Sequence, residues 1–99
     1  MTTNYARGAA FERAIVQHFR DHGFFAVRSA GSHSPVDVVA WDADSLYLIQ
    51  AKTGKVHPGT IRAAKAELEQ MLVPQSMSVH REVWVKSSVR GEDWIRYEV

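Results

Sequence analysis

The chain has 99 residues, a formal net charge of +1 at pH 7, 45% hydrophobic residues and 23% charged residues. This length suits one domain with a single core, and the composition is that of a globular protein. The sequence contains no cysteine, which excludes a disulfide scaffold and any thiolate metal site. No signal peptide is recognisable, and no apolar run approaches the roughly 20 residues that span a bilayer. We therefore expect one domain over residues 1–99, in the cytoplasm and without membrane contact.

The first 35 residues predict a helix, a strand and a loop. Over residues 5–22 apolar side chains recur with helical spacing, and Gly23 follows as a stop signal. Residues 24–29 are aromatic and β-branched, which is typical of a strand. The strand ends in the small and polar loop of residues 30–35.

A β-hairpin is predicted next. Residues 36–41 and 45–52 have strand composition and are separated by a tight turn over residues 42–45. An antiparallel register around this turn places Val39 opposite Leu48.

The second half of the chain predicts a helix and two strands. Thr60 follows the loop of residues 53–59 and is a suitable N-cap for a helix that Pro74 ends. The apolar stripe of this helix consists of Ile61, Ala64, Leu68, Met71 and Leu72. Residues 80–86 and 93–99 predict the last two strands, so the element order is αβββαββ.

Three polar residues interrupt the predicted hairpin. The register puts Asp37 opposite Gln50, with Cβ atoms about 4.5 to 5.5 Å apart, and Lys52 on the same face. Glu12 lies at the edge of the helix face that packs on the sheet, so its carboxylate can reach the sheet surface. Such oxygen ligands suit Mg²⁺, and Lys52 would stabilise or orient an attacking hydroxide. This arrangement predicts phosphodiester hydrolysis.

A structural ion pair is the alternative interpretation of a buried aspartate beside a lysine. Two features favour a functional site. The loop before Asp37 carries the aspartate to the mouth of a strand, where functional groups are common. The acidic Glu12 also interrupts an otherwise apolar helix surface.

Residues 7–40, RGAAFERAIVQHFRDHGFFAVRSAGSHSPVDVVA, followed by IQAK at residues 49–52, resemble the archaeal-type Holliday junction resolvases of the PD-(D/E)XK nuclease superfamily. About the first 55 residues resemble the family closely, and the rest resembles it by element order. The resemblance implies a restriction-endonuclease-like α/β fold, in which helices flank a central mixed five-stranded sheet. It also implies a homodimeric, metal-dependent endonuclease that resolves four-way DNA junctions by paired symmetric nicks.

The resemblance implies roles for individual residues. Glu12, Asp37, Gln50 and Lys52 would be the catalytic residues. The metal, Mg²⁺ with Mn²⁺ as a substitute, would be held by Asp37, Gln50, Glu12 and the main-chain carbonyl of Ala51. Gln50 stands where the usual motif has Glu, and because its amide oxygen carries no charge we expect a lower metal affinity.

DNA-binding residues are expected on both sides of this site. The resemblance places Arg13, Arg28 and Ser34 near the DNA or the active centre. Basic residues that follow the catalytic strand are further candidates for phosphate contacts, with a simple surface charge as the alternative. The complete predicted set is Arg7, Arg13, Arg28, Ser32, Ser34, Lys55 and Arg62.

Two other functions remain open from the sequence. One is a non-catalytic junction-binding module whose metal site is degraded, and the other is a nuclease of the same superfamily that acts on other DNA. His18 and His22 are spaced like a zinc pair, but we expect them on the polar face of the helix. The residues TGK at 53–55 lack the preceding glycine of a phosphate-binding loop, so no nucleotide cofactor is expected.

The dimer surface has two candidates. One is the apolar stripe of the second helix, and the other is the last strands with Trp84 and Trp94. Both features can equally belong to the core of one protomer. Trp41 is expected to pack beneath the first helix.

Overall fold

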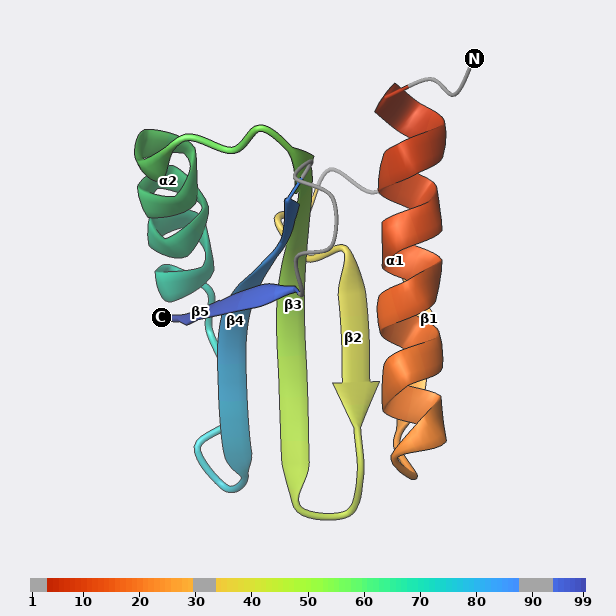
Figure 1. The fold of residues 1–99 in the computed structure, drawn as a ribbon. Helices are drawn as coiled ribbons and strands as arrows, with labels where there is room; N and C mark the ends of the chain where they lie inside the picture. Colours follow the sequence, from red (N-terminus) through yellow and green to blue (C-terminus); the bar gives the residue numbers. More distant parts are fainter. Residues whose placement is uncertain (1–3, 30–33, 88–93) are drawn as a thin grey trace.

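A mixed sheet lies between two helices in the computed structural model, which describes residues 4–29, 34–87 and 94–99 (Figure 1). The predicted element order αβββαββ is confirmed. The elements are α1 (Asn4–Asp21), β1 (Phe25–Arg28), β2 (Val38–Trp41), β3 (Ser45–Gly54), α2 (Pro58–Glu69), β4 (Ser78–Ser87) and β5 (Ile95–Glu98). Neither described helix is long and apolar enough to cross a membrane.

The five strands lie side by side in chain order, from β1 to β5. β3 and β4 are parallel, and the other three neighbouring pairs are antiparallel. A parallel pair needs a crossover connection, and α2 provides it. The predicted mixed five-stranded sheet flanked by helices is therefore confirmed.

Each helix covers one face of the sheet with its own core cluster. Alternate strand residues point to opposite faces of the sheet. The face that α1 covers carries the even-numbered residues of β2 and β4 and the odd-numbered residues of β3. The α1 cluster contains Phe11, Ile15, Val16, Phe19, Ala26, Val38, Ala40, Ile49 and Trp84. The α2 cluster contains Val36, Leu48, Ala64, Leu68, Val83 and Val85.

The hairpin register is as predicted, with Val39 paired to Leu48. Its turn is stabilised by Asp42, whose Oδ1 accepts hydrogen bonds from the backbone N–H groups of Asp44 at 2.9 Å and Ser45 at 2.8 Å. An aspartate that bonds the backbone two and three residues ahead favours a turn over a continued strand.

The start of α2 differs from the prediction. His57, not Thr60, is the N-cap; its backbone is extended, and no side chain caps the helix end. Pro58 occupies the first turn, where a missing N–H costs nothing and a fixed φ favours the helix. Thr60 lies inside the first turn, and its backbone N–H donates to the carbonyl of His57 at 3.0 Å.

Trp41 does not pack beneath α1, so that prediction was wrong. Its neighbour Ala40 points to α1, and alternation turns Trp41 to the other face. There it stacks on Phe25 with ring centroids 5.8 Å apart and remains 37% exposed.

Both predicted candidates for a dimer surface belong mainly to the protomer core. Leu68 in α2 and Trp84 in β4 are fully buried, and Trp94 packs against the α1 cluster. The helix was predicted to extend to Pro74, but α2 ends at Glu69, so Met71 and Leu72 follow the helix; Met71 packs against the α2 cluster, and Leu72 is fully exposed. The apolar stripe is therefore explained by packing of α2 on its own sheet.

Candidate active site

The predicted catalytic residues come from three elements. Glu12 lies in α1, Asp37 directly precedes β2, and Gln50 and Lys52 lie in β3. Because β2 and β3 are antiparallel, the start of β2 and the end of β3 lie at the same end of the sheet (Figure 1).

Asp37 sits where the regular β2–β3 ladder stops. The last regular pair is Val38 with Ile49, so the predicted direct opposition of Asp37 and Gln50 is not part of the ladder. The backbone N–H of Asp37 donates to the carbonyl of Ile49 at 2.8 Å. Two consecutive residues thus meet Ile49, which is the pattern of a β-bulge and changes the direction of the side chain. The Asp37 carboxylate consequently accepts a hydrogen bond from the backbone N–H of Ala51, over 2.9 Å to Oδ2.

The groups that shift the pKa of Asp37 show which residues lie near its carboxylate. Burial raises the pKa of Asp37 above its usual value, and the negative charge of Glu12 raises it further. The hydrogen bond from Ala51 and the positive charges of Lys52 and Arg28 act in the opposite direction. Glu12 and Lys52 therefore both lie close enough to influence the Asp37 carboxylate.

Gln50 supplies an oxygen atom without a partner. The side chain is 8% exposed, and within the described part of the chain its buried Oε1 accepts no hydrogen bond. An unsatisfied buried acceptor costs about 1 to 3 kcal/mol. A carboxylate and a free amide oxygen are ligands that a hard divalent cation accepts, so the donor chemistry fits such an ion.

Glu12 and Arg28 form an ion pair between α1 and β1. Nε of Arg28 donates to Oε1 of Glu12 at 3.1 Å, and both side chains are about four-fifths buried. Arg28 thus neutralises one of the two carboxylates that influence each other at this site.

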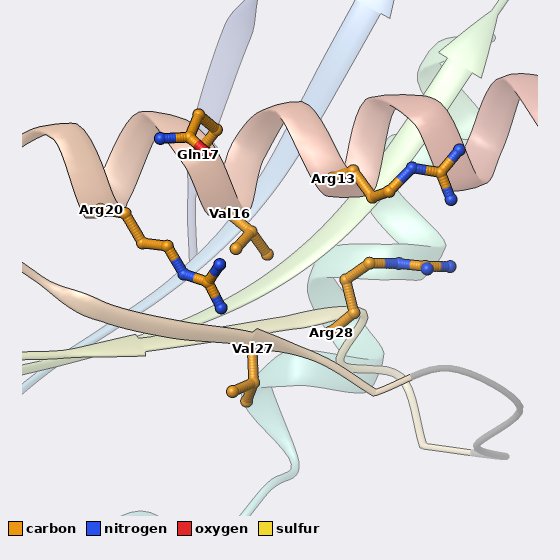
Figure 2. A pocket seen from close by; sticks show the side chains of 6 residues that line it. All are labelled: Arg13, Val16, Gln17, Arg20, Val27 and Arg28. Atoms are coloured by element: carbon orange, nitrogen blue, oxygen red, sulfur yellow. The ribbon is translucent and has the colours of Figure 1, made fainter.

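The predicted DNA-binding residues are distributed over both helices. Arg13 and Arg28 line one cavity between α1 and β1 (Figure 2). Arg7 in α1, Arg62 in α2 and Lys55 in the loop between β3 and α2 are exposed. Oγ of Ser34 accepts a hydrogen bond from the backbone N–H of Val36 at 3.1 Å. Ser32 lies outside the described residues.

Arg20 lines the same cavity and was missed in the sequence. Arg13 and Arg20 are seven residues apart, which places them on the same side of a helix, two turns from each other. This spacing in the sequence could have indicated that Arg20 lies on the same side of the helix as Arg13.

A second group of possible metal ligands lies on β4 and β5, where no catalytic residue was predicted. Ligand atoms of His80, Glu82 and Glu98 are within 4.8 Å of one another. Glu82 is buried and accepts a hydrogen bond from Nε1 of Trp84 at 2.9 Å, so it already satisfies a donor of the α1 core.

A mixed five-stranded sheet flanked by helices, in the element order αβββαββ, is a restriction-endonuclease-like fold. The sequence matches the family model of the archaeal Holliday junction resolvases (Hjc) over residues 3–98, and the chain belongs to this family. It is therefore a junction-resolving nuclease, and membership implies dependence on a divalent metal ion.

The solved structures support the fold. The Holliday junction resolvase Hjc of the hyperthermophile Archaeoglobus fulgidus is similar to this chain with a TM-score of 0.66 and 22% sequence identity. The match covers 93% of this chain and 72% of the other. None of the curated proteins matches the sequence.

Proposed function

We propose that this chain is a single cytoplasmic nuclease domain that resolves four-way DNA junctions by paired symmetric nicks, with Glu12, Asp37, Gln50 and Lys52 as catalytic residues. The observation that supports this site best is the surroundings of Asp37. Its half-buried carboxylate lies within the electrostatic reach of Glu12 and Lys52. Gln50 is next to the Ala51 N–H that binds this carboxylate, and it adds a buried oxygen that has no partner among the described residues.

Asp37, Gln50, Glu12 and the carbonyl of Ala51 are the proposed ligands of Mg²⁺, for which Mn²⁺ can substitute. A bound divalent ion stabilises the charge that develops on a scissile phosphate. The raised pKa of Asp37 supports the proposal, because a desolvated carboxylate gains when a cation shares its site.

Lys52, Glu12 and the basic residues also have proposed roles other than holding the metal. The Lys52 ammonium is proposed to orient and stabilise the attacking hydroxide, as a fixed positive charge beside the Asp37 carboxylate. Glu12 holds Arg28 through the ion pair, which keeps the guanidinium at the edge of the site. The proposed phosphate contacts along the DNA are Arg7, Arg13, Arg28, Ser32, Ser34, Lys55 and Arg62.

A homodimer is the proposed assembly, because a four-way junction has two strands to be cut symmetrically and a twofold dimer presents two sites. An exposed apolar patch suits this role: Phe25 is 68% exposed and Trp41 37%, and their rings stack on each other. The patch lies on β1 and β2, at the edge of the sheet opposite β5. A mass measurement by light scattering on wild type and Trp41→Ser tests it; a wild-type monomer at assay concentrations would contradict the dimer.

A cleavage assay tests the activity. A synthetic four-way junction, labelled on each strand in turn, is incubated with purified protein and increasing Mg²⁺ or Mn²⁺. We expect nicks in two opposing strands, and none with a linear duplex of the same sequence. Junction binding without cleavage under every metal condition would reject the proposed activity, and equal cleavage of the duplex would reject the junction specificity.

A further inference from the structure

The cavity between α1 and β1 is lined by three arginines. Its volume is about 390 Å³, and its walls are Arg13, Val16, Gln17, Arg20, Val27 and Arg28. In Figure 2, Arg20 lies at one end of the cavity, and Arg13 and Arg28 lie at the other. No acidic residue is among the described residues that line it.

The positive charge of this cavity is only partly neutralised. Glu12 pairs with Arg28, but among residues 4–29, 34–87 and 94–99 no carboxylate forms a salt bridge with Arg13 or Arg20. Gln17 adds no negative charge, and its amide donates to Oδ1 of Asp21 at 2.7 Å. Two full positive charges therefore remain available to an anion.

Arg20 is held in place by an uncharged partner. Its Nη2 donates to the carbonyl of Ala26 in β1 at 2.9 Å, which ties the guanidinium across the cavity. A guanidinium has five N–H donors, so this single bond leaves most of them available. A fixed planar fork matches the geometry of a phosphate and loses little entropy when it binds one.

The cavity continues from the active site. Arg28 belongs to both, because it lines the cavity and its charge influences Asp37. Arg20 follows Arg13 by seven residues, about 10.5 Å along a helix. Along the axis of a B-form duplex, which rises about 3.4 Å per nucleotide of each strand, this distance corresponds to roughly three nucleotides.

We propose that this cavity binds the phosphate backbone of the DNA next to the active site, and that Arg20 contacts a phosphate there within a few nucleotides of the scissile one. This inference rests on the proposed function. The chemistry favours backbone over base recognition, because the apolar lining consists of Val16 and Val27 and offers no aromatic ring for stacking. The contact is thus independent of sequence and sets the path of one junction arm.

The test measures how junction affinity depends on salt, in EDTA so that the DNA stays intact. Each phosphate contact contributes about −0.9 to the slope of log K against log salt. We expect Arg20→Gln to lower the steepness by about that amount per bound protomer, which is roughly a threefold smaller loss of affinity between 50 and 200 mM salt. Arg20→Lys should keep the wild-type slope, because it keeps the charge.

Arg96→Gln is the matched control, since it removes one exposed positive charge from β5, at the other edge of the sheet. Equal slopes for wild type and Arg20→Gln, or equal changes for Arg20→Gln and Arg96→Gln, would overturn the inference. If the wild type cuts junctions in either case, the proposed function stands and only the role of Arg20 is lost.

A second measurement needs no protein variant. One neutral methylphosphonate is placed at successive positions from the mapped cleavage site, and binding by the wild type is compared. We expect a reduced salt slope for at least one substitution within a few nucleotides of the cut, because the cavity adjoins the active site through Arg28. A scan without any effect at these positions, on either side of the cut, would contradict the proposal.

Discussion

Nε of Arg28 donates a hydrogen bond to Oε1 of Glu12 over 3.1 Å and so joins strand β1 to helix α1 beside the candidate active site. The pair is about four-fifths buried, so removing either partner would leave a poorly solvated charge without compensation. It sets the charge next to Asp37, because the Glu12 carboxylate raises the pKa of Asp37 and the Arg28 guanidinium lowers it.

Glu12→Gln should therefore lower the pKa of Asp37, since it removes a neighbouring negative charge. The titration of the Asp37 carboxyl carbon, followed by NMR in metal-free buffer, measures this shift. Glu67→Gln, an exposed change on α2, serves as the control and should leave the titration unaltered. An Asp37 pKa that is the same in Glu12→Gln and wild type would show that the two carboxylates do not interact. If Glu12 is catalytic as proposed, the variant also loses junction cleavage.

Asp37→Asn should abolish cleavage, retain junction binding and stabilise the metal-free protein at neutral pH. Because the folded state raises the pKa of Asp37, the folded protein binds the proton more tightly than the unfolded chain. The contribution of Asp37 to stability is thus complete below its ordinary pKa of about 4 and is lost as pH rises through the folded value. Asparagine can still accept the hydrogen bond from Ala51 and carries no charge.

Urea denaturation in EDTA at a series of pH values measures this effect. The advantage of Asp37→Asn over wild type should be largest near pH 7 and should shrink as the pH falls toward 4. Asp44→Asn removes an exposed carboxylate in the hairpin turn and should show no comparable gain. If Asp37→Asn is destabilised throughout this range, burial is not what raises the pKa.

Gln50→Met should stabilise the metal-free protein, because methionine fills a similar volume without leaving a buried acceptor unsatisfied. A gain of about 1 kcal/mol would raise the melting temperature by about 4 to 8 °C in a domain of this size. Gln75→Met changes an exposed glutamine and is the control. A lower melting temperature for Gln50→Met would mean that the amide has a polar partner in solution.

Gln50→Glu should lower the stability of the metal-free protein. With a divalent metal ion bound, the variant should regain this stability. A second buried carboxylate near Asp37 repels it, so the melting temperature in EDTA should fall. Added Mg²⁺ or Mn²⁺ should restore it, and calorimetry should show at least tenfold tighter binding of the ion, because the ligand then carries a full charge. Unchanged metal affinity would remove Gln50 from the ligand set.

The stability of the protein should decline as the pH falls below about 6.5, partly through His18. Burial, the neighbouring His22 and the charge of Arg96 lower the pKa of His18, while Asp21 raises it. The unfolded chain then binds a proton more readily, so the stabilising contribution is present above the ordinary pKa and is lost as the pH falls through the folded value.

His18→Gln should flatten this dependence in denaturation curves measured between pH 5 and 8 (roughly the range in which histidine titrates). His57→Gln changes an exposed histidine before α2 and should leave the curve as in wild type. Parallel curves for His18→Gln and wild type would assign the pH dependence to other groups.

The sequence predicted the elements and the hairpin register because both depend on local signals. The Asp42 side chain stabilises the turn through hydrogen bonds that reach only two and three residues ahead, and the register of Val39 with Leu48 follows from that turn. Alternation along a strand separates its residues into two sets on opposite faces of the sheet. It does not specify which of the two faces α1 covers. Trp41 was assigned to the wrong face for that reason.

The active site was predicted as a set of residues but not as a geometry. Asp37 approaches Ala51 because two consecutive residues meet Ile49, and such a bulge has no clear signal in a Val-rich strand. Oε1 of Gln50, which has no partner in the part of the chain that the structure describes, and the hydrogen bond from Arg20 to Ala26 both depend on how separate elements pack. These two features could be recognised only from the three-dimensional structure.

The parallel pairing of β3 with β4 also bears on when the enzyme can become active. β3 carries Gln50 and Lys52, and it is a central strand only after α2 has crossed over and β4 has docked along its whole length. During synthesis the N-terminal hairpin emerges first, with one edge of β3 unpaired. A partly made chain therefore contains every proposed catalytic residue and yet lacks the support that holds them in place, so DNA cleavage should be a property of the finished domain alone.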